Sequence, residues 1–246
     1  MSHWANKNIA DATVFQSDWS RNENHRLGFP KSTVEKVIMN AALPEFFNRL
    51  GKSEFDPKRK IRLIISSWSA NKAKGFDTYS WLDQNLDFSR FEVTFVGNSP
   101  VPFQHIKHVK PLPPDQLALL LKAHDIYIAA SEKDACSNAL IEGLSCGLPA
   151  IALNDGGHPE IVKNGGELFD EPDQIPFLIE KIVSDYDQYQ NQITLPTMEE
   201  TGSLYLDFIT DVFNQYARIP KKLSERALLQ LTGMRFINRL KNLTAR

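Results

Sequence analysis

The stretch DIYIAASEKDACSNALIEGLSCGLPAIALN (residues 125–154) decides the fold. It opens with an apolar run over 125–131 that hardly alternates between polar and apolar residues, which is typical of a strand buried on both faces of a parallel sheet. Ser137 can then cap a helix, and Gly147 can end it. A second apolar run follows at 149–154. This strand–helix–strand order predicts a parallel sheet that is covered by helices.

The same alternation continues on both sides of this stretch. Further short runs rich in β-branched and aromatic residues predict strands at 13–17, 36–40, 61–67, 91–97 and 106–109. Amphipathic segments predict helices at 77–85, 114–123, 138–145, 173–185 and 198–216. These spacings are typical of an α/β protein with a doubly wound, Rossmann-like parallel sheet.

The composition is that of an ordinary globular protein, with 246 residues, 42% of them hydrophobic and 24% charged. It excludes collagen-like, disulfide-framework and disordered classes. No run approaches the roughly 18 apolar residues of a membrane span, and no basic and apolar leader opens the chain. Cys136 and Cys146 form no Cys-x-x-Cys pair, which favours free thiols in a reducing compartment. We therefore expect a cytoplasmic protein.

The net charge of −2 conceals a basic C-terminal segment at 218–246. This segment holds eight lysines and arginines and one acid, so its net charge is +7 and that of the remainder is −9. An acidic body with a basic tail disfavours a nucleic-acid binder, which would be basic over its whole binding face.

Ligands of open α/β sheets bind at the carboxyl ends of the strands, so the loops there are the candidates for a site. After the strand at 61–67, Lys72 and Lys74 precede Gly75, just before a helix. Lysines in this position can neutralise a phosphate that also meets the helix amides. The alternative is a solvated pair of lysines on a loop.

The next such loop places Asp134 before the helix at 138–145 and Glu142 inside that helix. Together with Ser137 and Asn138, the free amides at the start of the helix can receive a diphosphate. The two carboxylates can accept hydrogen bonds from a ligand that carries several hydroxyls. Alternatively, Asp134 forms a turn and Glu142 is a solvated helix residue.

A third loop follows the run at 149–154. Its paired glycines, Gly156 and Gly157, can adopt backbone conformations that are closed to other residues. Pro159 suits the first turn of a helix, with Glu160 beside it. We expect a loop-to-helix turn that faces the same edge of the sheet, either as part of the site or as a purely structural turn.

Taken together, these loops resemble the signature of family 4 (group 1) glycosyltransferases, which are retaining enzymes of GT-B fold. The signature has a Glu-x7-Glu pair, which corresponds here to Asp134-x7-Glu142, and continues in a close match over GLSCGLPAIALNDGGHPEIV (143–162). WSANKAKGF (68–76) resembles the phosphate-side loop of the family. The segments ADATVFQSDWSR and VIMNAALPEFF, within 10–47, resemble the end of its N-terminal domain.

The resemblance covers nearly all of residues 9–170 and implies a role for each candidate. Glu142 would hold the ribose hydroxyls of the nucleotide, Asp134 the hydroxyls of the donor sugar, and Lys74 the leaving phosphate. The other candidates are expected around the nucleotide: Gly75, Gly97, Ser137, Asn138, Gly156, Gly157 and Glu160. The family needs no metal, so the resemblance implies no cofactor beside the nucleotide-sugar donor.

The sequence departs from the family pattern in three ways. The first Glu is Asp134, which is one carbon shorter, and the family's Gly-Phe-Gly beside it is Ala-Cys-Ser at 135–137. The basic residue that usually stands five before the loop lysine is Ser69, for which Lys72 can substitute. These departures bear on the donor sugar and on turnover more than on nucleotide binding.

The resemblance implies three parts. Residues 1–58 hold the last piece of an acceptor-binding domain and a linker, 59–195 a nucleotide-sugar-binding domain, and 196–246 C-terminal helices with the basic tail. The chain would be a fragment, a truncated relative, or one subunit whose partner chain supplies the other half.

The expected function is transfer of a sugar, with retention, from a nucleoside-diphosphate sugar to a glycan, lipid or small acceptor. The alternative is a catalytically impaired nucleotide-binding or structural subunit. A Rossmann oxidoreductase is disfavoured, because no G-x-G-x-x-G follows a strand.

The basic tail at 218–246 has three interpretations. It can draw the chain to the anionic inner face of a membrane, because each basic residue there contributes about 1 kcal/mol. It can instead cross back onto the N-terminal domain, as C-terminal helices of this fold do, or it can be a solvated end.

Overall fold

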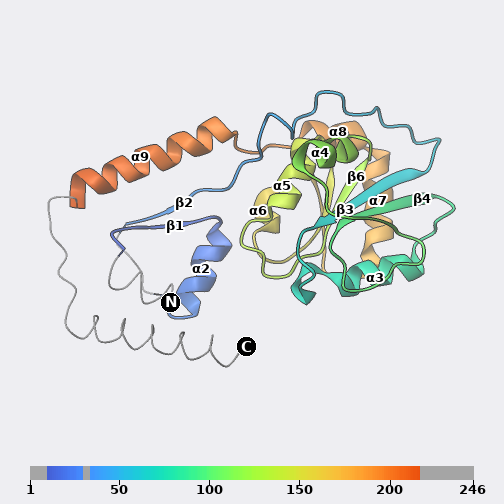
Figure 1. The fold of residues 1–246 in the computed structure, drawn as a ribbon, viewed down its shortest axis with the longest axis horizontal. Helices are drawn as coiled ribbons and strands as arrows, with labels where there is room; N and C mark the ends of the chain where they lie inside the picture. Colours follow the sequence, from blue (N-terminus) through green and yellow to red (C-terminus); the bar gives the residue numbers. More distant parts are fainter. Residues whose placement is uncertain (1–9, 30–33, 217–246) are drawn as a thin grey trace.

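A computed structural model describes residues 10–29 and 34–216 (Figure 1). Its larger unit is built on a six-stranded sheet in which all pairings are parallel and the strand order is β5-β4-β3-β6-β7-β8. The strands are β3 (Ile61–Ser67), β4 (Phe91–Gly97), β5 (Lys107–Val109), β6 (Ile126–Ala129), β7 (Ala150–Leu153) and β8 (Gly166–Phe169). The order reverses between β3 and β6, which confirms the predicted doubly wound α/β fold.

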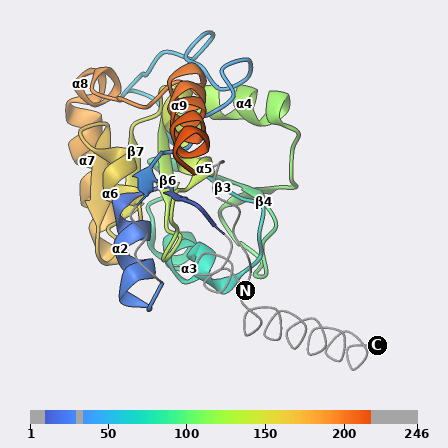
Figure 2. The same cartoon turned by 90° about the vertical axis from the view of Figure 1, so that its left-hand side faces the viewer.

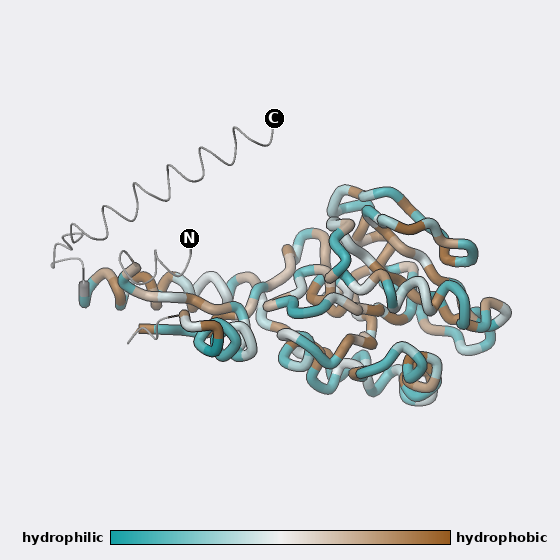
Figure 3. The backbone as a smooth tube through the Cα atoms, turned by 90° about the horizontal axis from the view of Figure 1, so that it is seen from below, coloured by the Kyte–Doolittle hydropathy of each residue, from teal (hydrophilic) through white to brown (hydrophobic). Residues whose placement is uncertain are grey.

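Helices cover both faces of this sheet (Figure 2). On one face, α3 (Phe76–Asn85) and α7 (Ile175–Ser184) bury their apolar side chains in one cluster with residues of β3, β4, β6, β7 and β8. On the other face lie α4 (Pro114–Lys122), α5 (Asn138–Ser145) and α6 (His158–Val162). Because both faces are covered, β6 and β7 contain no charged residue and are almost wholly buried, and Figure 3 shows hydrophobic residues inside the larger unit. Short elements complete the unit: η1 (Lys72–Lys74), η2 (Pro172–Gln174) and α8 (Tyr186–Asn191).

The smaller unit is a parallel pair of strands, β1 (Thr13–Phe15) and β2 (Glu35–Val37), joined through α2 (Asp18–Arg26). The long helix α9 (Met198–Tyr216) lies beside this unit in Figure 1. The Thr201 hydroxyl of α9 donates to the Met39 carbonyl at 3.4 Å. The Lys36 ammonium of β2 lies 5.9 Å from the centre of the Phe208 ring. The chain therefore passes between the two units twice, before β3 and before α9.

The elements predicted at 61–67, 91–97, 138–145 and 198–216 begin and end as expected. The other predicted strands and helices are present with ends that differ by one to three residues, and β8 was not predicted. Both cysteines are free and buried. In the described part of the chain, no helix is long and apolar enough to cross a membrane. The basic segment at 218–246, with the interpretations attached to it, lies outside the described residues.

Candidate functional site

The site lies where the strand order reverses. Loops that follow the neighbouring strands β3 and β6 leave the sheet in different directions there, and ligands of open α/β sheets bind in the crevice between them. The structure has a cavity of about 230 Å³ at this point. Its walls come from the ends of both strands, the two loops and the first turn of α5; they include Ser66, Ser67, Trp68, Ser69, Lys74, Ser131, Asp134, Cys136, Ser137 and Asn138. We call it the Lys74 cavity.

Lys74 reaches this cavity because of the turn that follows it. Gly75 has a φ of 84°, and a Cβ there would lie 2.2 Å from the carbonyl oxygen of Ala130, the residue that follows β6. Only glycine allows both the left-handed conformation and this close packing. The Lys74 Nζ lies 2.9 Å from Asp134 Oδ2. Lys72 points elsewhere: it is exposed, does not line the cavity, and forms a surface pair with Asp77 at 3.5 Å.

Asp134 is held in its ionised form. Burial by itself would raise the pKa of this carboxyl, but the hydrogen bond and charge of Lys74 outweigh it and bring the pKa below its usual value. Asp134 Oδ2 also lies 3.2 Å from the Ser131 hydroxyl, and Oδ1 accepts the Cys136 backbone N–H at 3.3 Å. In the described structure, the acidic and the basic candidate of the cavity therefore neutralise one another.

The start of α5 forms the facing wall. Ser137 caps the helix, because its hydroxyl oxygen accepts the Leu140 backbone N–H at 3.4 Å. Asn138 follows at the first helical position, and its side-chain oxygen accepts from the Asn40 amide at 2.7 Å. The first amides of a helix carry a partial positive charge. The wall thus combines helix amides, a hydroxyl and an amide side chain next to Lys74.

Glu142 lies in an adjoining cavity of about 360 Å³. This second cavity, the Glu142 cavity, shares Asn138 with the first and is also lined by Asn40, Pro114, Ile141, Met198 and Thr201. Burial raises the pKa of the Glu142 carboxyl to about 7. Among the described residues, no hydrogen bond or ion pair reaches this carboxyl. The two carboxylates that sequence reasoning placed around one ligand thus line two neighbouring cavities.

Gly156 and Gly157 pack against the loop at 130–137, which carries Asp134 and is called the Asp134 loop. Gly156 has a φ of 64°, and a Cβ at either glycine would lie 2.4 Å from a carbonyl oxygen, that of Asp134 or Ala135. The Gly157 N–H donates to the Asp134 carbonyl at 2.8 Å. The loop-to-helix turn predicted here is confirmed, with α6 beginning at His158.

Two other predicted residues lie behind the walls. Gly97 ends β4 with a φ of 129°, and a Cβ there would lie 1.8 Å from the Ser67 carbonyl oxygen, so it backs the cavity wall. The Glu160 carboxylate turns to α2 and accepts the backbone N–H groups of Asp18 and Trp19, each at 2.8 Å. Neither residue lines the Lys74 or the Glu142 cavity.

Sequence reasoning missed three polar residues at the site. His158 is buried, with Nδ1 3.0 Å from the Leu153 carbonyl oxygen and Nε2 3.1 Å from the Ser131 hydroxyl. Burial lowers the pKa of its imidazole. Asn40 joins the site from the smaller unit. Ser131 and His158 stand within the quoted motifs and could have been found there, whereas no local signal marks Asn40.

Among residues 10–29 and 34–216, no group of three or more His, Cys, Asp or Glu side chains is placed to hold a metal ion. The polar groups that face the two cavities are instead a lysine, helix amides, hydroxyls and carboxylates. This set suits a ligand with a strong anion at one end and hydroxyls at the other.

The sheet order and the cavity at the switch point define a doubly wound α/β protein with a crevice where ligands of such sheets bind. Residues 103–194 match the family described as "Glycosyl transferases group 1". N-acetyl-alpha-D-glucosaminyl L-malate synthase of Bacillus anthracis is 37% identical over 158 residues, which are 58% of this chain and 42% of that protein. Residues 103–194 are therefore similar to the group 1 glycosyl transferases.

Solved structures agree on the fold. The glycosyltransferase of Rickettsia africae ESF-5 superimposes with a TM-score of 0.66 at 16% identity, over 86% of this chain and 67% of that one. Anabaena Alr3699/HepE in complex with UDP-glucose gives a TM-score of 0.63 at 14% identity, over 87% and 65%. The fold is therefore of the GT-B type. The chain spans less than half the length of the Bacillus relative.

Proposed function

We propose that the chain binds the nucleoside diphosphate of a sugar donor across the Lys74 and Glu142 cavities and takes part in a retaining, metal-independent hexosyl transfer of the family 4 kind. One observation carries the proposal: Lys74 and the start of α5 line a single cavity at the switch point of a group 1 glycosyl transferase fold. The activity of the whole protein is part of the proposal, because the chain covers 42% of the Bacillus relative.

The chemistry needs groups that stabilise a departing diphosphate. As the bond between the sugar and the phosphate breaks, negative charge grows on the phosphate oxygens. Lys74 and the amides at the start of α5 offer preformed positive charge next to that position. The proposal therefore assigns this task to the chain's own groups rather than to a metal.

The two carboxylates would hold the rest of the donor. When a diphosphate draws Lys74 away, the Asp134 carboxylate becomes available to accept hydrogen bonds from the sugar hydroxyls. Glu142 follows Asn138 by one helical turn, in the adjoining cavity, where it can accept from ribose hydroxyls. Gly75, Gly97, Gly156 and Gly157 would act by shaping the loops rather than by touching the donor.

A nucleotide-binding subunit without turnover is the second candidate. It is favoured by Asp134, which is shorter than the glutamate of the family pattern, and by Ser69, which lines the cavity where the family has a base. Lys72, the other basic residue of that loop, points into solvent. Lys74 would then be the single lysine of the loop that meets the diphosphate.

The acceptor side belongs to the proposal as well. A glycan, a lipid or a small molecule would receive the sugar, and a second chain would supply the remainder of the acceptor-binding half. One structural relative is described as a GtfA/B complex, with a TM-score of 0.58 at 13% identity, over 87% of this chain and 48% of that one.

Calorimetric titration with UDP, GDP and ADP tests the binding step. We expect saturable binding of one nucleotide, and in Glu142→Ala an affinity about tenfold lower, since hydrogen bonds to a charged group contribute about 1.5 kcal/mol or more. The exposed Glu199→Ala is the matched control. No binding of any of the three at millimolar concentration would refute the proposal.

Turnover separates the two candidates. Slow hydrolysis or transfer of the donor sugar by the wild type, absent in Lys74→Ala, supports the transferase. Nucleotide binding without any release of sugar, in the presence of a range of acceptors, supports the binding subunit.

A further inference from the structure

The contact between Glu160 and α2 joins the two units beside the donor site. The first amides of a helix have no acceptor within the helix. In α2, the Ser17 hydroxyl takes the Ser20 N–H at 3.0 Å, which is an ordinary cap. The Asp18 and Trp19 amides donate instead to the two carboxylate oxygens of Glu160, 142 and 141 residues further along the chain. Glu160 thus completes the cap of a helix in the other unit.

This contact is favourable in itself. Hydrogen bonds from backbone amides to a charged acceptor are stronger than neutral ones, and a negative charge at a helix N-terminus gains from the helix dipole. Both oxygens of Glu160 are engaged, one on each amide. The side chain is therefore committed to α2 and is turned away from both cavities.

The backbone of Glu160 belongs to a turn that is held against the loop carrying Asp134. Glu160 stands in the first turn of α6, which begins directly after Gly157, and the backbone of Gly157 packs against the carbonyls of that loop. The buried His158 of the same turn lies 3.1 Å from the Ser131 hydroxyl, which itself lies 3.2 Å from Asp134. Loop, turn and α2 are thus connected by hydrogen bonds over a short path.

A second link runs in parallel on the other side of the site. The Gln16 amide donates to Asn40 at 3.1 Å, and Asn40 donates to Asn138 at 2.7 Å. Asn138 lines both cavities. The segment that holds β1 and α2 is therefore attached to both walls of the proposed donor site, by Glu160 to one and by Asn40 to the other.

We propose that Glu160 is a positioning residue: its carboxylate ties α2 to the Asp134 loop, so that occupation of the Lys74 cavity is transmitted to the N-terminal unit. The tie, by which we mean the hydrogen bonds of Glu160 to α2, does not depend on the proposed function. The transmission, by which we mean the effect of a bound nucleotide on α2, rests on that function. Coupling between two sites is reciprocal. If nucleotide binding stabilises the contact between Glu160 and α2, this contact strengthens nucleotide binding by the same free energy.

Amide hydrogen exchange of the full chain, resolved by NMR, tests the tie without a ligand. In Glu160→Ala we expect the Asp18 and Trp19 amides to exchange at least tenfold faster. Glu160→Gln retains one acceptor oxygen and should fall between Glu160→Ala and the wild type, while Glu199→Ala should leave both amides unchanged. Unchanged exchange in Glu160→Ala would overturn the proposal. Core amides of β3 report whether each variant is folded.

Adding UDP tests the transmission. In the wild type, saturating UDP should slow exchange of these two amides about threefold, and in Glu160→Ala the effect should vanish with no more than a threefold loss of UDP affinity. A loss of tenfold or more with unchanged α2 exchange would show that Glu160 contacts the ligand and would overturn the proposal. If the wild type bound no nucleotide, the proposed function and the transmission would both fail, and exchange in the absence of ligand would still decide the tie.

Discussion

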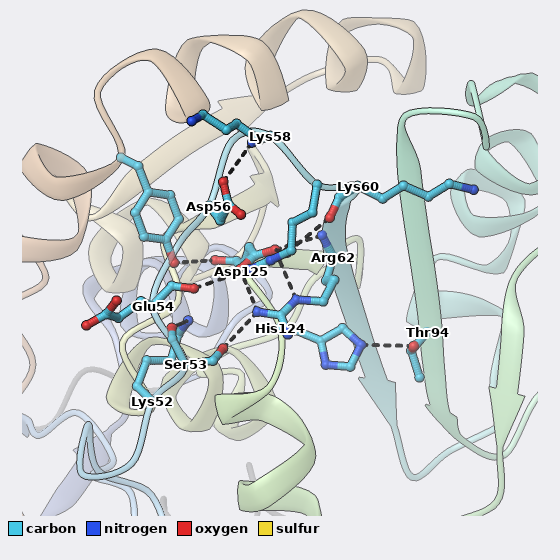
Figure 4. Close-up of polar contacts among 12 residues, drawn as sticks. Lys52, Ser53, Glu54, Asp56, Lys58, Lys60, Arg62, Thr94, His124 and Asp125 are labelled. Carbon is cyan, nitrogen blue, oxygen red and sulfur yellow. Dashed lines mark hydrogen bonds and ion pairs between the residues drawn. The ribbon is translucent and has the colours of Figure 1, made fainter.

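A carboxylate at each end of the six-stranded sheet is removed from solvent, but the two differ in their hydrogen-bond partners. At the amino end, just before β6, Asp125 is fully buried and accepts five hydrogen bonds from Arg59 and Arg62 (Figure 4). At the carboxyl end, Glu142 is half-buried beside a cavity and accepts none from the described residues.

The pKa values follow the partners rather than the depth. Burial alone would raise the pKa of Asp125, but the hydrogen bonds from Arg59 and Arg62 hold it below its usual value. Glu142 is less buried, yet its pKa rises to about 7, because nothing offsets the loss of solvent. A carboxylate whose burial is offset stabilises the fold, and one whose burial is not offset is available to a ligand.

Removing Asp125 should have the largest effect. Asp125→Ala leaves two arginines without their shared acceptor, so we expect the free energy of unfolding to fall by about 3–5 kcal/mol, as for other broken buried ion pairs. Urea denaturation at pH 7 measures it. A loss below about 1 kcal/mol would contradict a structural role for this cluster, since surface substitutions usually stay within about 0.5 kcal/mol.

Replacing Glu142 should stabilise the folded protein at high pH, in contrast to replacing Asp125. The folded protein binds the Glu142 proton more tightly than the unfolded chain does, because the pKa is raised from 4.5 to about 7. This contribution is fully present below about pH 4.5 and is lost as the pH rises through 7. Glu142→Gln avoids the loss, so at pH 8 it should be more stable than the wild type by about 1–3 kcal/mol.

Denaturation at pH 5 and pH 8 measures this difference, which should shrink at the lower pH. Glu199→Gln, at an exposed position on α9, is the control and should show no such dependence. A Glu142→Gln variant that is less stable than the wild type at pH 8 would mean that the ionised carboxylate has a partner in the folded protein.

Replacing Asp134 should have the smallest effect of the three, and this effect is on nucleotide affinity. Under the proposed function, its ion pair with Lys74 would compete with a phosphate of the nucleotide for the same ammonium. Asp134→Asn removes the competition and keeps an oxygen to accept the Cys136 N–H, so UDP should bind about two- to fivefold more tightly, which is the range of a partly exposed ion pair. Calorimetry measures it, with the exposed Glu132→Gln as the control for net charge. Weaker UDP binding would show that Asp134 organises the loop instead.

The strands that carry the site were predictable because their signals are local. Apolar runs that do not alternate marked β3 and β6, and the capping serine with the terminal glycine marked α5. Strand β8 was missed because it has four residues and opens on Gly166, which lies where a Cβ would come within 2.0 Å of the Ala150 carbonyl oxygen. That glycine is explained by the neighbouring strand and not by its own segment.

The candidate site was predictable in part. Lys74, Asp134, Ser137 and Asn138 line one cavity, as strand ends that meet at a switch point require. The sequence carries no sign that Lys74 and Asp134, 60 residues apart, pair with one another. Nor does it show that Asn40 comes from the smaller unit to Asn138, because that contact depends on how the chain passes between the units.

The sequence by itself determined the order of elements, the loops at the carboxyl ends of the strands and the residues that could serve there, since periodicity, caps and turns act within a few residues. Only the tertiary structure decided where each acidic side chain points: Asp134 to Lys74, Glu142 into its own cavity, and Glu160 to the amides of α2. These three acids have different partners because the groups around them come from distant parts of the chain. Burial and hydrogen-bond partners, rather than residue type, therefore set the charge state of each carboxylate and the groups that it can bind.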